Sequence, residues 1–394
     1  LRSIIEVEGT DGAVGLSETY GDLPVLSLLQ KVGPQLVGMN AWSLNKLRDR
    51  VNAQLKDVQA ANSGADLAPG SHPSKQAANA YSAFEVALLD LQARSMGIPL
   101  VDLLGGAVRD TVPFSAYLFF KYAEHIGSPY GPDRWGEALT VEQIVAQAKK
   151  MIDQYGFKSI KLKAGVLDPD IEADCITALK KAFPGHMLRI DPNAAWKLET
   201  AARIHEKIRD DLEYYEDPTP GLEGMSELYR LTGIPLATNM VVTDFDEFRR
   251  SLPLNAVQIV LSDHHYWGGL RNTLVLAKMC ETFGIGISMH SNSHLGISLM
   301  AMAHVAAACP NLSYACDTHY PWQEEEDEVI VGGKVPIMDG CVRIQDNPGL
   351  GVELDRERLA KQHEVYNSID IRSRDDGAQM KKYDPEWEFI KPRF

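Results

Sequence analysis

Three oxygen donors at nearly equal intervals constrain the fold of this chain more than any other feature. Asp191, Glu216 and Asn239 each end an apolar run, and they are separated by 25 and 23 residues. One strand, one helix and two loops take about that length, so the spacing predicts βα repeats. Because successive parallel strands end at one edge, the three donors should converge. Two carboxylates and an amide carbonyl suit a hard cation, Mg²⁺ above all.

The same period continues on both sides of this stretch. Polar residues end seven successive apolar runs, with gaps of 28, 25, 23, 24, 27 and 27 residues: Lys163, Asp191, Glu216, Asn239, Asp263, His290 and Asp317. A further strand at 114–120 makes eight βα units, which predicts an α/β fold with a (β/α)₈ TIM-type barrel. A doubly wound sheet is the competing interpretation, but its strands rarely carry a polar residue at every carboxyl end. In a barrel these ends share one mouth, where active sites lie.

The segments that flank the repeats predict an α+β capping domain. We expect residues 1–112 and 321–394 to form this cap, and residues 113–320 to form the barrel. The sequence opens at Leu1 in what should be the middle of a sheet. An earlier strand is therefore expected to precede it.

Local patterns fill in the cap. Alternating apolar residues around a turn at 9–12 predict a hairpin. Helices are expected over 23–55 and 75–97, with a Gly- and Pro-containing loop at 62–74 between them. Residues 329–354 resemble two short strands, which should return to the sheet of the hairpin. The last thirty residues are polar and predict irregular surface structure.

Composition narrows the classes of partner. The net charge of −15 disfavours nucleic acid and anionic membranes as partners. The five cysteines are odd in number and lack CxxC spacing, which indicates reduced, mostly buried thiols in a cytosolic protein. No apolar run reaches the roughly eighteen residues of a membrane span, and no signal peptide is evident. We expect a cytoplasmic homo-oligomer that acts on a small molecule.

Two lysines flank Leu162 on the second predicted barrel strand. Residues i and i+2 of a strand share a face, so Lys161 and Lys163 should both point into the barrel. A buried lysine pair without a function is unusual, because each charge must be desolvated. Beside a cation, each lysine would lower the pKa of the other, which would make one of them a base near neutral pH. The alternative is a pair at a surface edge.

A carboxylate and an imidazole end two neighbouring strands. Asp263 and His290 should therefore lie within hydrogen-bonding reach, and the carboxylate would fix the tautomer of the imidazole and raise its basicity. A single histidine is weak support, since the chain has eleven. Two bases facing each other across a metal suit abstraction of a proton α to a carboxylate, with the metal stabilising the anion that forms.

These residues resemble the mandelate racemase branch of the enolase superfamily, and within it the glucarate dehydratases. The resemblance covers roughly residues 80 to 380 and rests on these motifs: Lys161-Leu-Lys163, Asp191-Pro-Asn193, Ala237-Thr-Asn239-Met240, His290-Ser-Asn292, Asp317-Thr-His319 and Asn347-Pro-Gly-Leu-Gly351. Asn239 stands where most relatives of mandelate racemase place a carboxylate.

The resemblance implies Mg²⁺-dependent loss of water from an acid sugar such as glucarate or its epimer idarate. His290, supported by Asp263, would remove the α-proton of one epimer, and Lys163 would serve the opposite face. Lys161 would neutralise the metal-bound carboxylate. The remaining implied substrate contacts are oxygen-binding residues and one basic residue for the distal carboxylate, namely Asn193, Asn292, His319 and Arg374.

Three functions fit this set of residues. The first is an acid-sugar dehydratase that yields a 2-keto-3-deoxy acid. The second is a racemase or epimerase of a 2-hydroxy acid, because two opposed bases also permit proton transfer from one face to the other. The third is a non-catalytic paralogue, against which the full set of ligands and bases argues. Solvent deuterium incorporation without loss of water would select the second over the first.

Overall fold

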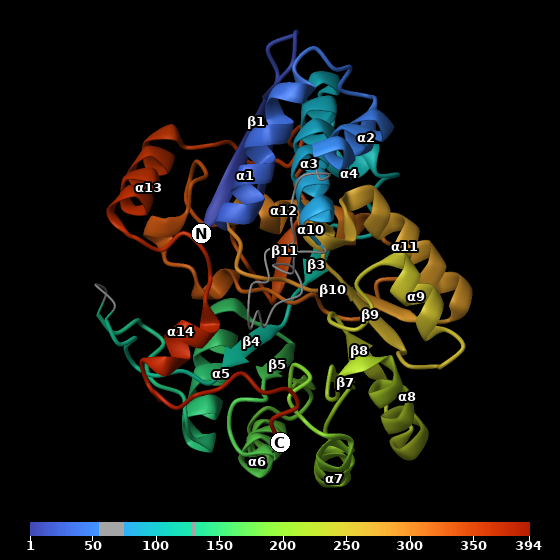
Figure 1. Ribbon diagram of the computed structural model, residues 1–394, viewed down its shortest axis with the longest axis vertical. Coiled ribbons are helices and arrows are strands. Elements are labelled where there is room, and N and C mark those ends of the chain that lie inside the picture. Colours follow the sequence, from blue (N-terminus) through green and yellow to red (C-terminus); the bar gives the residue numbers. More distant parts are fainter. Residues whose placement is uncertain (55–74, 128–130) are drawn as a thin grey trace.

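A curled sheet of parallel strands forms the centre of the molecule (Figure 1). The computed structural model describes residues 1–54, 75–127 and 131–394. Within that part, seven strands pair in the order β10-β9-β8-β7-β6-β5-β4. Their bounds are β4 Ala116–Phe119, β5 Ser159–Lys163, β6 Met187–Asp191, β7 Tyr214–Glu216, β8 Leu236–Thr238, β9 Ile259–Ser262 and β10 Gly286–Met289. The predicted strand order and the polar strand ends are therefore confirmed.

The eighth predicted strand, at 313–319, closes the barrel without forming a regular strand. The Cys316 N–H donates to the Pro113 carbonyl at 2.8 Å, and Phe114 and Cys316 form a parallel bridge just before β4. On the other side the Asp317 N–H donates to the Met289 carbonyl of β10 at 2.9 Å. The backbone of this segment thus forms hydrogen bonds alternately with its two neighbours. The fold is a TIM-type barrel in which the eighth strand is irregular.

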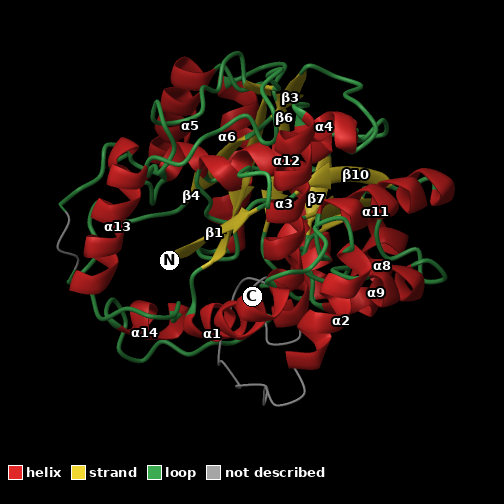
Figure 2. Ribbon diagram, turned by 90° about the horizontal axis from the view of Figure 1, so that it is seen from above, coloured by secondary structure: helices red, strands yellow, loops and turns green. Residues whose placement is uncertain are grey.

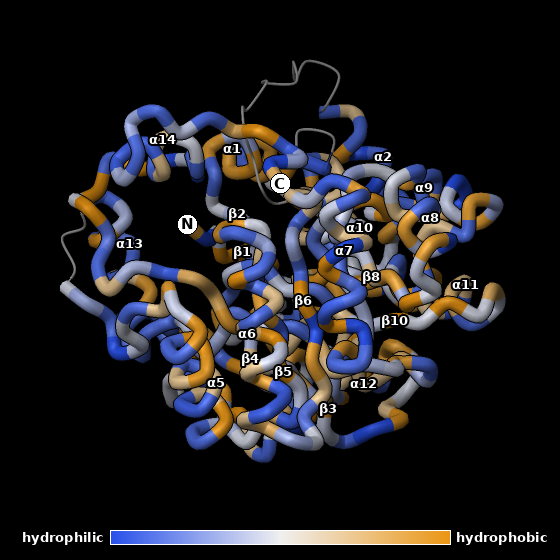
Figure 3. Tube along the Cα trace, turned by 90° about the horizontal axis from the view of Figure 1, so that it is seen from below, coloured by the Kyte–Doolittle hydropathy of each residue, from blue (hydrophilic) through white to orange (hydrophobic). Residues whose placement is uncertain are grey.

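Helices surround the sheet, and the amphipathic ones among them turn their apolar faces toward it. Their bounds are α5 Val141–Tyr155, α6 Pro169–Ala182, α7 Leu198–Ile208, α8 Gly221–Thr232, α9 Phe245–Ser251, α10 His264–Trp267, α11 Leu270–Phe283 and α12 Gly296–Ala308. In α5 the buried residues include Ile144, Ala148 and Met151, three to four positions apart. Thr140 and Gln143 form a capping box at its start. Figure 3 shows the resulting mixture of hydrophobic and hydrophilic residues along these helices.

The cap begins with the predicted hairpin, β1 Arg2–Glu8 paired antiparallel with β2 Val14–Tyr20. The helix expected over 23–55 is interrupted. It consists of α1 Leu23–Val32, a 3₁₀ turn at Gly33–Leu36 and α2 Leu44–Gln54. Pro34 lacks the N–H that would continue α1, which explains the break. The long helix α3 Gln76–Met96 ends at Gly97 as predicted, and α4 Leu100–Leu103 follows. The loop expected at 62–74 lies outside the described residues.

The C-terminal segment pairs differently from the prediction. β11 Cys341–Arg343 forms an antiparallel pair with β3 Thr111–Pro113, and not with the hairpin. The end of the chain is also more helical than expected, with α13 Arg356–Ser368 and α14 Asp376–Lys381. Asp355 and Asp375 cap these helices, a local signal that the polar composition masked. Short 3₁₀ turns lie at Tyr320–Trp322 and Glu325–Asp327.

Two glutamates of the cap bind the starts of two barrel helices, α12 and α11, which are labelled in Figure 2 together with α3 of the cap. Neither helix has a side-chain cap of its own. Glu18 of β2 accepts from the N–H groups of Leu295 (2.8 Å) and Ser298 (2.9 Å) at α12. Glu85 of α3 accepts from the N–H of Leu270 at 2.6 Å at the start of α11. These carboxylates satisfy otherwise unpaired donors and face the positive ends of the helix dipoles.

The cysteines are unpaired and mostly buried, as the sequence predicts. All five cysteines are free thiols, and four of them are buried. Among the described helices, none combines the length and the apolarity that crossing a bilayer requires.

Candidate active site

Lys161 lies at the centre of the barrel mouth, fully buried among acidic groups. Its Nζ donates to Glu216 Oε1 at 2.5 Å and to Asp317 Oδ2 at 2.6 Å, and it lies 3.3 Å from Asp191 Oδ2. It also lies 4.5 Å from the centre of the Tyr117 ring. Burial by itself lowers the pKa of Lys161, but the carboxylates of Asp317 and Glu216 outweigh it and raise the pKa well above the usual value. The surface-edge alternative is therefore wrong.

Lys163, two residues further on, is less enclosed. Its side chain is 22% exposed, and its Nζ donates to Asp191 Oδ2 at 2.6 Å and to Asn193 Oδ1 at 2.8 Å. The two lysines share a face, as the spacing in β5 predicts. Their contacts differ, because one lies deep among carboxylates and the other lies at the opening. That difference makes Lys163 the more accessible of the two lysines.

Asp191, Glu216 and Asn239 come together at the ends of β6, β7 and β8. The Asn239 Nδ2 donates to Glu216 Oε1 at 2.9 Å. Burial and the neighbouring charge of Asp191 raise the pKa of Glu216 well above its usual value. For Asp191, burial is outweighed by Lys163 and Lys161, and its pKa is lowered. The three donors thus occupy one buried cluster, and its charges depend strongly on one another.

The donor set fits a divalent cation. Glu216 Oε2 is buried and has no hydrogen-bond partner in the described part of the chain. An unpaired carboxylate oxygen in a dry site is costly, and a cation would satisfy it. The Asn239 side chain donates through its Nδ2, and its amide oxygen is a further possible ligand. Oxygen ligands of this kind suit Mg²⁺.

Asp217 is an acidic residue of this site that the sequence analysis missed. It lies close enough to Asp191 and Glu216 for the three to hold one metal ion. Its two oxygens are already used, however: Oδ1 accepts from the Thr238 hydroxyl at 2.5 Å and Oδ2 from the Asn239 N–H at 2.8 Å. Burial, followed by the charge of Asp191, raises its pKa to about 7. Asp217 therefore positions Asn239, and its place next to Glu216 in the sequence was the available signal.

Three residues of the strand-end loops adopt backbone angles that only glycine adopts easily. They are Asn193 (φ 56°), Ala194 (φ 60°) and Asp217 (φ 38°). Such conformations cost of the order of 1 kcal/mol or more each and persist only where surrounding contacts hold them. Here the Asn193 N–H donates to Asp191 Oδ1 at 2.9 Å and the Ala194 N–H to the Asp217 carbonyl at 2.6 Å. The strained loops thus fix the carboxylates that they follow.

Asp263 and His290 meet on the other side of the mouth. His290 Nδ1 lies 3.2 Å from Asp263 Oδ2 and 3.4 Å from the Tyr266 hydroxyl. Desolvation alone would raise the pKa of the buried Asp263 carboxyl, but His265 and His290 hold it well below its usual value. Asp263 is thus an ionised partner that orients the imidazole. The strands β6 to β9 separate β5, which carries Lys163, from β10, which precedes His290.

The other predicted substrate residues divide into two groups. Asn193 lies beside Lys163. His319 Nδ1 lies 3.2 Å from the Ser291 hydroxyl, and the His319 ring centre lies 4.7 Å from that of Tyr117. Asn292 and Arg374 line a pocket of about 270 Å³ together with Arg2 and Tyr20.

Arg374 contacts two acidic neighbours, Asp376 and Asp22. Its Nε lies 2.7 Å from Asp376 Oδ1, and its backbone N–H donates to Asp22 at 2.8 Å.

Sequence reasoning did not assign Asp317 or His265 to the site. Asp317 was among the polar strand ends expected at the mouth, but no role was assigned to it. For His265 the sequence offered no signal beyond its type.

The closed barrel and its cap define an enolase-type fold, and the comparisons identify the branch. Residues 143–358 match the enolase C-terminal domain-like family, and residues 2–105 match the mandelate racemase / muconate lactonizing enzyme N-terminal domain. The chain belongs to this mandelate racemase / muconate lactonizing enzyme branch of the enolase superfamily. Its relatives there include dehydratases and cycloisomerases, so the family is one of enzymes.

Three relatives cover almost the whole chain. A probable glucarate dehydratase of Streptomyces coelicolor is 48% identical over 392 residues, which are 98% of this chain and 90% of the relative. An enolase of Pseudomonas fluorescens Pf0-1, solved with magnesium, potassium and tartrate, is 67% identical, with a TM-score of 0.98 over 100% of this chain and 92% of that one. An enolase of Gibberella zeae PH-1, solved with magnesium, formate and sulfate, is 47% identical, with a TM-score of 0.94 over 100% and 91%.

Proposed function

We propose that this protein is a Mg²⁺-dependent acid-sugar dehydratase that resembles glucarate dehydratase. One observation carries the proposal. Lys163 and the His290–Asp263 pair approach a buried carboxylate cluster from strands on different sides of one mouth. A substrate carboxylate held at the cluster would present its α-carbon between the two bases. Loss of the α-proton and of the β-hydroxyl, together one molecule of water, gives an enol that tautomerises to a 2-keto-3-deoxy acid.

In this proposal each base serves one configuration at the α-carbon. His290 accepts the proton from one epimer, and Asp263 stabilises the imidazolium that results. Lys163 accepts it from the opposite face. Lys161, enclosed by Glu216 and Asp317, stays protonated and donates to the substrate carboxylate. The high pKa of Lys161 makes it a poor base and a good electrostatic partner.

The metal would be held by Asp191, Glu216 and Asn239. The unpaired Glu216 oxygen and the magnesium in both neighbouring structures support this assignment. When bound, Mg²⁺ would supply positive charge that stabilises the substrate carboxylate as its α-proton leaves. Asp217 keeps Asn239 in position through its backbone N–H.

The substrate is proposed to be a hydroxylated diacid. Asn193, Asn292 and His319 would hold its oxygens, and Arg374 its distal carboxylate. The relative named a probable glucarate dehydratase and the tartrate in the Pseudomonas structure both point to such acids. We also propose the domain bounds 1–112, 113–320 and 321–394 and a homo-oligomeric assembly.

A screen of mono- and diacid sugars for 2-keto-3-deoxy products tests the dehydratase proposal. Product should form from at least one diacid, and removal of divalent metal with a chelator should abolish it until Mg²⁺ is restored. The racemase alternative is favoured by the same two opposed bases. Deuterium uptake from solvent at the α-carbon of a substrate that never loses water would support it and would overturn the dehydratase.

A further inference from the structure

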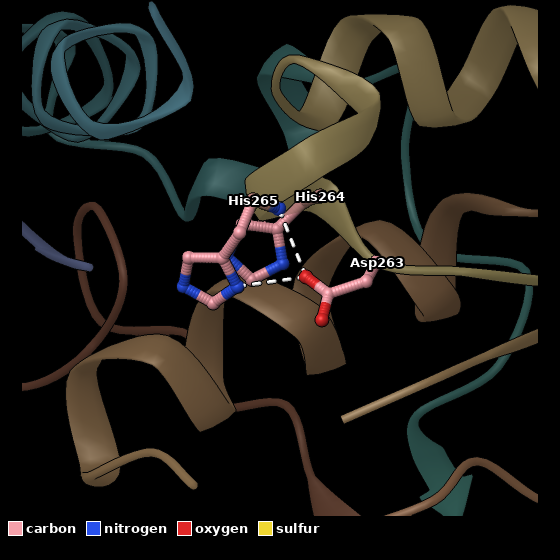
Figure 4. Close-up of side chains that lie close together, drawn as sticks. All are labelled: Asp263, His264 and His265. Atoms are coloured by element: carbon pink, nitrogen blue, oxygen red, sulfur yellow. Dashed lines mark hydrogen bonds and ion pairs between the residues drawn. The ribbon is translucent and has the colours of Figure 1, made fainter. Parts of the chain in front are cut away.

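The carboxylate of Asp263 has two imidazole partners, and the proposed reaction uses only one of them. Its Oδ2 lies 3.2 Å from His290 Nδ1. Its Oδ1 lies 2.7 Å from His265 Nδ1 and accepts from the His265 backbone N–H at 2.9 Å. Figure 4 shows this second arrangement, with both contacts drawn from Asp263 to His265. The His265 contact is the shorter of the two imidazole contacts.

A metal site is the competing interpretation of this cluster. Asp263, His264 and His265 lie close enough to hold one ion. However, a separation of 2.7 Å between Nδ1 and Oδ1 is that of a hydrogen bond and leaves no room for an ion between the two atoms. The other carboxylate oxygen is occupied by His290. The His264 ring makes no hydrogen bond to Asp263 within the described residues, so the cluster is a hydrogen-bonded chain.

The far side of His265 fixes its tautomer. Its Nε2 lies 2.8 Å from the Ser298 hydroxyl of α12 and 3.4 Å from the Arg2 guanidinium, which can only donate. Arg2 is in turn paired with Glu18 at 2.5 Å. A neutral His265 with its proton on Nδ1 satisfies both sides, because it then donates to Asp263 and accepts from Ser298.

We propose that His265 is a positioning residue for the catalytic pair, holding Asp263 ionised and oriented so that His290 can act as a base. This inference rests on the proposed role of His290. A buried carboxylate that loses one of its donors binds a proton more tightly. The loss of this donor should therefore appear as a higher pKa of the Asp263 carboxyl.

Several other charged and titratable groups surround the hydrogen-bonded series His265–Asp263–His290 and affect its response to pH. The ring of His264 lies 4.1 Å from that of His265, and the ring of Tyr20 lies 5.3 Å away. Tyr266 contacts His290 at 3.4 Å, and the charge of Asp263 reaches His294. Arg2 and Glu18 complete the set. A substitution of His265 should therefore be tested with all of these groups unchanged, so that a shift of the pH profile can be assigned to His265.

Two polar replacements of His265 separate positioning from packing. An asparagine amide nitrogen reaches the place of Nδ1, whereas a glutamine amide nitrogen reaches the place of Nε2. His265→Asn therefore keeps the donor to Asp263, and His265→Gln removes it while keeping a polar partner for Ser298. His264→Gln is the matched control, since it changes the neighbouring buried histidine.

The measurement is deuterium exchange at the α-carbon of each epimer of an accepted acid sugar, followed across pH. His265→Gln should slow exchange of the His290-dependent epimer about 10- to 100-fold near neutral pH and move its acid limb up by ~1 pH unit. Exchange of the Lys163-dependent epimer should stay within about twofold. His265→Asn should restore most of the lost rate, and His264→Gln should leave the pH profile in place.

Three results would overturn the inference. One is equal slowing of both epimers by His265→Gln, and another is an unshifted acid limb. The third is the same loss in His265→Asn as in His265→Gln, with both variants folded by circular dichroism. His290→Asn in the same assay separates this failure from that of the proposed function. If His290→Asn slows neither epimer, the proposed role of His290 fails, and the role of His265 fails with it.

Discussion

Lys163 and His290 reach the mouth from different strands, and this residue-scale feature allows a direct test. His290→Asn should abolish α-proton exchange of one epimer and spare exchange of the other, and Lys163→Met should do the reverse. General-base loss is worth about 10²–10⁴-fold, so either effect is measurable by NMR-detected deuterium exchange. Asp263→Asn should weaken only the His290 half, because it touches no proposed metal ligand. Equal slowing of both epimers by both substitutions would refute a two-base site.

The sequence could predict which residues converge but not how they share hydrogen bonds. Asp191, Glu216 and Asn239 follow the βα period, and their convergence depends only on strand direction. The role of Asp217 depends instead on a left-handed backbone angle after β7, which no periodicity encodes. His265 reaches Asp263 through one turn of helix and a particular ring orientation. Such contacts are fixed by local geometry that residue type alone leaves open.

At the scale of elements, the start of α11 packs tightly against the cap. Gly269 has φ 96°, and a Cβ added there would lie 1.9 Å from Glu85 Oε2. Gly269→Ala should therefore cost more than about 3 kcal/mol of unfolding free energy in urea. Gly284→Ala is the control, since Gly284 also has a positive φ, of 68°, but has open space around it. Its cost should be about 1–2 kcal/mol, from the backbone alone. Equal costs would mean that the contact with Glu85 is unimportant.

The same contact predicts a pH dependence. Burial raises the pKa of Glu85 from 4.5 to about 7, against the hydrogen bonds from Leu270 and Arg271. The folded state therefore binds the proton more tightly than the unfolded state, and stability from this group is fully present below about pH 4.5 and lost as pH rises through about 7. Glu85→Gln should remove ~3 kcal/mol of that decline, measured by urea unfolding across pH. Glu206→Gln, at an exposed glutamate of α7, should leave the decline as it is.

Elements were predictable where the signal was local and unpredictable where partners were distant. The barrel strands and helices each carry their own periodicity, so their positions follow from the sequence. The partner of β11 does not, because Cys341–Arg343 could pair with any free edge in the cap. It pairs with Thr111–Pro113, over two hundred residues earlier. The eighth barrel segment lies where the sequence predicts, but it forms only isolated bridges. Its pairing could not be predicted either, because its two neighbouring strands come together only when the whole sheet closes.

At the scale of the whole molecule, metal binding should stabilise the folded chain. A ligand that binds only the folded state adds about 2.7 kcal/mol at one hundred times its Kd. Mg²⁺ should therefore raise the Tm by a few degrees in a thermal-shift measurement that requires no substrate. Glu216→Gln should remove most of this shift. Glu206→Gln, an exposed carboxylate on α7, should retain it. An undiminished shift in Glu216→Gln would place the ion elsewhere.

Because Glu18 caps α12, this contact between the cap and the barrel can form only late in biosynthesis. The two N–H groups that this carboxylate accepts from lie 277 and 280 residues further along the chain. At about 5–20 residues per second, α12 leaves the ribosome roughly 15 to 55 seconds after the hairpin. For that time the side of β2 that packs on α12 has no native partner. The nascent chain is therefore most open to misassociation until its last barrel helix has been made.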